Sequence, residues 1–233
     1  MVTTVETKEE PFLHIEETPV YFKEDWSTGI GGGLWSTGKA MAMYFRDHPN
    51  LIRSNVQKIN CFDDRKGLQA LELGSGNGLL SVCLAAVIRD MIGKLVVTDL
   101  DDHLDLMEKT VRANSHILNS DIGNVDKSKP LSEVKEHRWG EFDNCETEDK
   151  FDFIFGSDVA YRDWLHEPLI KSLVRYSHRG TILLIGVTMH DTKPKFFSLL
   201  KEHGFTYQRI PDYQMAPEFR GSTFGLFVIQ RQY

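Results

Sequence analysis

The sequence predicts an α/β fold with a doubly wound sheet of seven strands, mostly parallel and ending in an antiparallel C-terminal hairpin. Two observations lead to this prediction. From residue 68 onward, short apolar runs alternate with segments of helical periodicity, which is typical of a parallel sheet covered by helices. The last two apolar runs have no helix between them. Since a parallel pair would need a long crossover, these two strands are expected to be antiparallel neighbours.

The expected elements follow in chain order. Polar residues 1–10 precede a small β-hairpin with strands at 12–15 and 20–23. The glycine-rich stretch 29–33 leads to a helix that begins at Ser36 or Thr37 and ends near Arg46. The strands of the sheet are expected at 68–73, 95–99, 133–139, 151–157, 181–187, 206–210 and 224–230. Its helices are expected at 79–89, 104–114, 168–176 and 196–202, with polar loops at 120–130 and 144–150.

The turn after the first strand of the sheet carries the strongest functional signal. Glu72 lies in the strand, and Gly74, Gly76 and Gly78 follow it at the spacing E-x-G-x-G-x-G. Glycines let the backbone turn sharply and approach a ligand without a Cβ in the way. The next strand ends in Asp99, whose carboxylate can accept hydrogen bonds from both hydroxyls of a ribose. Together they predict a Rossmann-like, nucleotide-binding βαβ unit.

The spacing of the glycines excludes two classes of nucleotide site. A dinucleotide fingerprint would need a small residue at position 79, which is Leu79. A phosphate-binding P-loop would need a lysine in the glycine loop, and this loop has none. A glycine-rich turn in an ordinary α/β protein is the structural alternative, and the carboxylate at Asp99 argues against it.

Further candidate residues lie where other strands end. Trp35 follows the glycine stretch, Trp139 ends the third strand, and Ser157, Asp158 and Tyr161 leave the fourth. Ligands of open α/β sheets bind at the carboxyl ends of the strands, so these side chains are expected to meet there. The structural alternatives are core packing for the tryptophans and the tyrosine, and a helix N-cap for Asp158.

Five stretches together resemble the family 16 protein methyltransferases of the seven-β-strand class, and within them the methyltransferase-like 21 group of lysine methyltransferases. The stretches are Gly33–Trp35, Leu71–Gly78, Thr98–Leu100, Arg138–Gly140 and Phe151–Tyr161. The last contains the group's [D/E]-x-x-[Y/F] motif, from Asp158 to Tyr161. The resemblance implies an S-adenosylmethionine-dependent methyltransferase domain at residues 29–233, preceded by an N-terminal extension at 1–28.

The resemblance also implies a role for each matching residue. The residues implied to bind the cofactor, S-adenosyl-L-methionine, are Trp35, Gly74, Ser75, Gly76, Asp99, Trp139 and Ser157. The glycine loop would contact the methionine moiety, Asp99 the ribose and Ser157 the adenosine region, while the two tryptophans line the pocket. Asp158 and Tyr161 would be the catalytic residues: Asp158 holds and orients a lysine ammonium, and Tyr161 forms a wall of the channel and stabilises the cation over its ring.

The implied function is methyl transfer from S-adenosylmethionine to a lysine side chain of a protein, without a metal. The alternative is a methyltransferase that acts on a small molecule or on a protein histidine, because the glycine motif is shared among them. Nucleic-acid amino-methyltransferases carry Pro-Pro where this chain has Val159 and Ala160. A binding protein without catalysis is disfavoured by the intact motifs. Family relatives modify chaperones and translation factors, so a protein of that kind is the expected partner.

Composition narrows the remaining choices. A formal net charge of −7 argues against a nucleic-acid partner, which would favour a basic surface. Cys61, Cys83 and Cys145 form neither a disulfide pattern nor a zinc pattern, so a reducing compartment is expected. No apolar run reaches membrane-spanning length, and residues 1–10 lack a signal-peptide core. We expect a cytoplasmic monomer, with a nuclear location as the alternative. The histidines expected to serve only packing or the surface are His137, His166 and His190.

Overall fold

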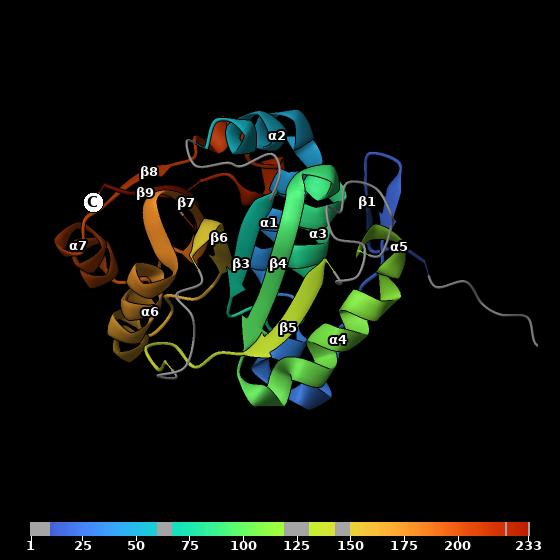
Figure 1. The fold of residues 1–233 in the computed structure, drawn as a ribbon, viewed down its shortest axis with the longest axis horizontal. Helices are drawn as coiled ribbons and strands as arrows, with labels where there is room; N and C mark the ends of the chain where they lie inside the picture. The colour runs from blue at the N-terminus through green and yellow to red at the C-terminus, as the bar shows by residue number, and fades with distance from the viewer. Residues whose placement is uncertain (1–9, 60–66, 119–130, 143–149, 222, 233) are drawn as a thin grey trace, which may run out of the picture.

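The computed structural model describes residues 10–59, 67–118, 131–142, 150–221 and 223–232. The strands of its main sheet are β3 (Leu68–Leu73), β4 (Ile92–Asp99), β5 (Ser132–Glu136), β6 (Phe151–Ser157), β7 (Ser177–Thr188), β8 (Phe205–Arg209) and β9 (Phe224–Arg231). Their order across the sheet is β5-β4-β3-β6-β7-β9-β8 (Figure 1). Strands β3 to β7 pair in parallel, whereas β9 runs antiparallel to β7 and β8. The predicted mostly parallel sheet with an antiparallel C-terminal pair is confirmed.

Helices cover both faces of this sheet (Figure 1). The helices on one face are α1 (Ser36–Asp47), α2 (Pro49–Gln57), α3 (Leu79–Ile88), α4 (Leu104–Ala113) and the short α5 (Ser115–Leu118), and those on the other are α6 (Asp163–Tyr176) and α7 (Pro194–Glu202). Leu68 and Ala70 of β3 join the apolar cluster of α1 and α3, while Leu71 and Leu73 join that of α6 and α7. Strands buried on both faces explain the continuous apolar runs of the sequence.

The segment that forms α3 has no polar face in the sequence, and the surroundings of the helix explain this. All its residues except Ala86 are buried, because β4 lies on one side and α1, α2 and α4 on others. A helix enclosed in this way is apolar all round. It follows Gly78, which has a left-handed φ of +82° that favours glycine. The glycine turn therefore delivers the chain directly from the sheet into a buried helix.

The predicted N-terminal hairpin is present, but its second strand lies at Thr18–Val20 rather than at 20–23, because the turn takes only residues 16 and 17. It consists of β1 (Leu13–Ile15) and β2 (Thr18–Val20), paired antiparallel. Ile15 and Val20 are fully buried in the apolar cluster that also contains the buried residues of α1 and α3. The hairpin is thereby packed onto the helical layer of the main sheet.

Several elements of the main domain differ from the expectation. Strands β4 and β7 begin at Ile92 and Ser177 rather than at 95 and 181, and the short helix α5 is not predicted. The sequence does not predict α2, because Ile52 and Val56 are the only buried residues of this polar segment and leave a weak apolar pattern. Pro49 lies at the start of the helix, a position that proline favours. Helix α6 begins at Asp163 rather than at Pro168, which lies inside the helix. Strand β5 ends at Glu136, three residues before the expected end at 139. The expected loop at 120–130 and residues 144–149 of the second loop lie outside the described residues. Within the described ranges, no helix is long and apolar enough to cross a membrane.

Candidate active site

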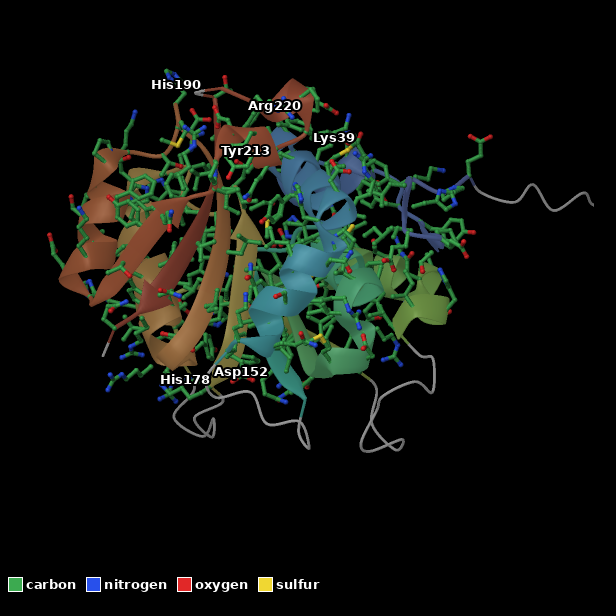
Figure 2. All side chains as sticks on the ribbon, turned by 90° about the horizontal axis from the view of Figure 1, so that it is seen from above. Lys39, Asp152, His178, His190, Tyr213 and Arg220 are labelled. Carbon is green, nitrogen blue, oxygen red and sulfur yellow. The ribbon has the colours of Figure 1, made fainter. Side chains whose placement is uncertain are left out.

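The carboxyl ends of the parallel strands bring most candidate residues to one edge of the sheet. Gly74 follows β3, Asp99 ends β4 and Ser157 ends β6. Asp152 and His178, at the starts of β6 and β7, mark the opposite edge in Figure 2. The residues labelled near the candidate edge in Figure 2 are His190, Arg220, Tyr213 and Lys39.

The glycine loop is shaped by left-handed backbone and by close contacts. Gly74 and Gly76 have φ angles of +63° and +64°, which favour glycine. A Cβ on Gly74 would lie 2.7 Å from the Trp139 ring and 2.9 Å from Val159. A Cβ on Gly76 would lie 2.8 Å from the carbonyl oxygen of Gly31. The sequence argument expects these glycines to make room for a ligand, and the structure adds that the protein's own atoms also require them.

Asp99 is held by the loop that it faces. One carboxylate oxygen accepts from the backbone N–H of Gly76 at 2.7 Å and the other from that of Leu100, also at 2.7 Å. The ring nitrogen Nδ1 of His103 lies 3.7 Å from this carboxylate. Each oxygen has two lone pairs, so each retains one acceptor site beyond its backbone bond. The arrangement can receive two further donors, as a ribose diol would supply.

Glu72 lies beneath the glycine loop and is buried. Its carboxylate accepts from the backbone N–H of Ser81 at 3.1 Å and from the Ser81 hydroxyl. Burial raises the pKa of Glu72 to about 7, although hydrogen bonds from Ser81 and Ser75 act in the opposite direction. Ser75 also accepts from the backbone N–H of Gly78 at 3.0 Å. Glu72 therefore connects the glycine loop to the first turn of α3 through Ser75 and Ser81.

The two tryptophans occupy different surroundings. Trp35 is 49% exposed, its indole N–H donates to the carbonyl of Ile30 at 3.0 Å, and its ring meets Trp26 edge-on at 6.1 Å. This exposure rules out the core alternative for Trp35. Trp139 is half-buried and packs against the apolar cluster of α6 and α7 as well as against Gly74. Its surroundings are therefore compatible with both pocket lining and packing.

Ser157 lies where α1 approaches the sheet. Its Oγ would be 3.2 Å from a Cβ on Gly38, and a Cβ on Gly186 of β7 would lie 2.7 Å from the Thr37 methyl group. The missing side chains at Gly38 and Gly186 thus allow the first turn of α1 to come close to the ends of β6 and β7. This contact brings Trp35, the residue before α1, to the same edge as Ser157.

Asp158 has an unusual backbone and polar partners from two distant segments. Its φ is +54°, a left-handed value that is uncommon outside glycine, and its N–H donates to the Gly186 carbonyl at 2.9 Å. Its Oδ1 accepts from the Thr188 hydroxyl at 2.9 Å, and the hydroxyl of Thr37 lies 3.1 Å from that of Thr188. Burial raises the pKa of Asp158, while hydrogen bonds from Thr37 and Thr188 oppose this and the charge of Asp191 adds to it.

The helix-cap alternative for Asp158 does not hold. Helix α6 begins at Asp163 with Arg162 in the capping position. Tyr161 is 40% exposed, and the Arg162 guanidinium lies 5.8 Å from the centre of its ring. The side chain of Tyr161 is therefore accessible rather than packed in the core, and the carboxylate of Asp158 is half-buried.

The three histidines lie as expected. His137 is buried, with Nε2 2.9 Å from the Ser172 hydroxyl, and burial lowers its pKa to about 4. His166 is also buried, with Nε2 3.0 Å from the Ala160 carbonyl. His190 is exposed (Figure 2). Two of them are thus packed and one lies at the surface, and the expectation that none acts as a base stays a prediction.

Sequence reasoning missed three residues of the site. Thr188 and Thr37 are the partners of Asp158, and His103 lies beside Asp99. The hydroxyl that bonds Asp158 is 30 positions away along the chain, so no local motif connects the two residues. Only the position of Thr188 could have indicated it as a site residue, because Thr188 ends a parallel strand at the ligand-binding edge.

Known proteins resemble this chain in sequence. The family model described as lysine methyltransferase matches residues 14–203. Protein N-lysine methyltransferase METTL21A of Mus musculus is 23% identical over 195 residues, covering 82% of this chain and 76% of that protein. Protein-lysine N-methyltransferase EFM3 of Saccharomyces cerevisiae is 26% identical over 161 residues, covering 69% of this chain and 44% of that protein.

Solved structures show the same fold. CurJ carbon methyltransferase superposes with a TM-score of 0.62 at 14% identity, covering 89% of this chain and 61% of that chain. Ribosomal protein L11 methylase from Lactobacillus delbrueckii subsp. bulgaricus superposes with a TM-score of 0.53 at 14% identity, covering 84% of this chain and 80% of that chain. At these identities the likeness establishes the architecture of the sheet and its helices.

Proposed function

Because the chain belongs to the family of lysine methyltransferases and is an S-adenosylmethionine-dependent methyltransferase, we propose that it methylates a lysine side chain of a protein substrate. The observation that carries the proposal is the placement of Asp158 and Tyr161 in one short segment after β6. A half-buried carboxylate with a raised pKa precedes an accessible aromatic ring by three positions at the ligand-binding edge of the sheet. An incoming cationic side chain would meet both groups.

The residues present fit the cofactor. Asp99 retains an acceptor site on each oxygen for the ribose hydroxyls. The glycine loop would hold the methionine moiety, Ser157 would lie at the adenosine, and Trp35 and Trp139 would be walls of the pocket. When bound, S-adenosylmethionine supplies an electrophilic methyl group on a sulfonium cation. The role of the protein is then to hold this group and an acceptor in line.

The acceptor must reach this group as a neutral amine. An unperturbed lysine has a pKa of about 10.4, so the neutral form costs about 4.6 kcal/mol at pH 7. Asp158 would receive the ammonium and fix its approach, and the ring of Tyr161 would form one side of the channel. The burial that raises the pKa of Asp158 also marks surroundings that favour a neutral amine over a charged one. We assign Asp158 to orientation of the lysine.

Exposed apolar side chains support a protein substrate over a small molecule. Among the described residues, the large apolar side chains that are exposed are Trp26, Ile30, Trp35, Leu51, Tyr161, Trp164 and Tyr213. All except Leu51 lie before α1, between β6 and the first turn of α6, or in the connection between β8 and β9, and these segments are at the carboxyl edge of the sheet. Apolar residues gathered around a site are typical of a protein-binding surface.

Transfer of tritiated methyl groups into an unmethylated cell lysate tests the proposed function. Label should appear in a protein and, after hydrolysis, in methylated lysine; chaperones and translation factors are the classes that we expect among the labelled proteins. Label in methylated histidine or in the small-molecule fraction would establish the alternative acceptors. Cofactor binding without any transfer in lysates from several sources would favour a binding protein.

Asp99→Ala is expected to weaken cofactor binding by about 1.5–3 kcal/mol, because hydrogen bonds to a charged group contribute on that scale. Calorimetry with S-adenosylhomocysteine, the demethylated product, measures this change directly. Asp99→Asn keeps one acceptor oxygen and should fall between the wild type and the alanine variant. Unchanged affinity in Asp99→Ala, or binding of NAD in place of S-adenosylhomocysteine, would contradict the assignment.

Trp139→Ala is expected to reduce cofactor affinity while the protein keeps most of its melting temperature, because the ring is half-buried beside Gly74. Tryptophan fluorescence should change when S-adenosylhomocysteine is added, and the change should shrink in Trp139→Phe. Trp164→Phe is the control, since Trp164 is 72% exposed on α6. A loss of several kcal/mol of stability in Trp139→Ala with normal affinity would instead show that the ring serves the core.

A further inference from the structure

One buried side chain joins the N-terminal part of the protein to the end of α4. Asn114 is fully buried. Its Oδ1 accepts from the backbone N–H of Tyr21, and its Nδ2 donates to the carbonyl of Tyr21, both at 2.8 Å. The same Nδ2 donates to the Thr110 carbonyl at 2.9 Å. The amide thus pairs with Tyr21 as a neighbouring strand would, using its donor and its acceptor. Tyr21 begins the segment from residue 21 to residue 35, which we call the strap.

The two ends of the strap are connected through Glu24. Its carboxylate accepts from the backbone N–H of Leu34 at 2.9 Å and from the indole N–H of Trp26 at 3.0 Å. The N–H of Asp25 donates to the carbonyl of Gly32 at 2.9 Å. These bonds join the first part of the strap to its last part and enclose the glycines in the middle.

The middle of the strap lies on the glycine loop. A Cβ on Gly31 would be 3.1 Å from the Cα of Gly76 and 2.3 Å from the ring of His103. The side-chain amide of Asn77 donates to the Gly33 carbonyl at 2.9 Å. The strap is therefore a wall above the residues proposed to hold the cofactor.

The strap and α4 are separated along part of their length. A surface hollow of about 510 Å³ lies between residues 21–25 of the strap and Leu106, Lys109, Thr110 and Ala113. At the end of this hollow the hydrogen bonds of Asn114 connect Tyr21 to the helix, and Phe22 packs against the apolar cluster that contains Met107.

We propose that Asn114 is a positioning residue for the cofactor: by clamping Tyr21, it holds the strap against the glycine loop and slows cofactor dissociation. This inference rests on the proposed function, in which the glycine loop and Asp99 hold S-adenosylmethionine. Asn114 is not assigned to contact the cofactor, because its side-chain bonds go to Tyr21 and Thr110. Its effect is transmitted through the strap.

Asn114→Ala tests the proposal through cofactor binding and through the strap itself. Well below the melting temperature, affinity for S-adenosylhomocysteine should fall about fivefold, the effect of one typical hydrogen bond, mostly through faster dissociation. Hydrogen–deuterium exchange without cofactor should become faster at the amides of Asp25, Gly32 and Leu34. A purely structural role for Asn114 would lower the melting temperature without these two changes.

Three further variants separate the clamp from a general loss of stability. Ile117→Ala removes a buried side chain one turn away and leaves the clamp intact, so it should lower the melting temperature while affinity and strap exchange stay unchanged. Glu24→Ala removes an exposed carboxylate that ties the strap together, and it should weaken binding even if Asn114→Ala does not fold. Glu17→Ala, in the exposed hairpin turn, is its matched control.

The proposal is wrong if folded Asn114→Ala binds S-adenosylhomocysteine with normal affinity and its strap amides exchange at the normal rate. If Asn114→Ala does not fold, the same result in Glu24→Ala would overturn the proposal. Weaker binding in Asp99→Ala with normal binding in both strap variants would overturn the clamp alone and leave the cofactor site in place. Absence of S-adenosylhomocysteine binding by the wild-type protein would overturn the cofactor site and the clamp together.

Discussion

Asp158→Asn is expected to lower the rate of methyl transfer at least about 100-fold, because misplacing a reacting group costs on that scale. Asparagine can still accept from the Thr188 hydroxyl and tolerates the left-handed φ of +54° better than alanine. The substitution therefore removes the charge with little effect on the fold. Affinity for S-adenosylhomocysteine should be nearly unchanged, since Asp158 is assigned to the acceptor. Turnover on the labelled lysate protein and calorimetry on the same preparation separate the two effects.

The neighbouring charge supplies a control for this result. Asp191 is exposed, and its charge raises the pKa of Asp158. Asp191→Asn removes one carboxylate close by without touching the proposed acceptor site, and it should keep most of the activity. Tyr161→Phe keeps the ring and should also stay active, whereas Tyr161→Ala should not. Full turnover by folded Asp158→Asn would remove the central residue of this mechanism and move the acceptor site elsewhere.

The sequence predicts the sheet well where burial leaves a simple signature. Strands β3 and β6 begin and end at the expected residues, because strands covered on both faces are continuous apolar runs between turns. Helix α2 leaves no such signature, since it lies on the outside of the helical layer with Ile52 and Val56 as its only buried residues. Helix α6 was misplaced at its start because proline favours a first turn, and here Pro168 lies within the helix.

The sequence predicts which positions form the candidate site, but it does not predict which side chains surround each of them. The glycines and Asp99 follow from local spacing, and the order of the strands then places them together. The environment of Asp158 depends on hydroxyls from α1 and from the end of β7, and these are brought together only by packing. The strap was recognisable only as a glycine-rich stretch, because its contacts with Gly76 and Asn114 join residues far apart in the chain.

Glu72→Gln is expected to change how stability depends on pH. The pKa of Glu72 is raised from 4.5 to about 7 by burial. Between these values the native protein binds more protons than the unfolded chain, so this residue makes the free energy of unfolding fall as pH rises. At about 1.4 kcal/mol per pKa unit, the cost of the charge reaches about 3 kcal/mol above pH 7. Glutamine has no charge to bury and can still accept from Ser81.

His137 opposes Glu72 over nearly the same pH range. Burial lowers its pKa from 6.5 to about 4, so the unfolded chain binds more protons there, and stability rises with pH by a similar amount. The two residues should largely cancel in the wild-type protein. Urea unfolding of Glu72→Gln from about pH 4 to pH 8 should therefore reveal the rise due to His137, about 3 kcal/mol in size. Replacing His137 with glutamine in that background should remove the rise again. If the curves of the wild type and Glu72→Gln run parallel across this range, Glu72 is ionised in the native protein at its ordinary pKa, and its burial carries no such cost.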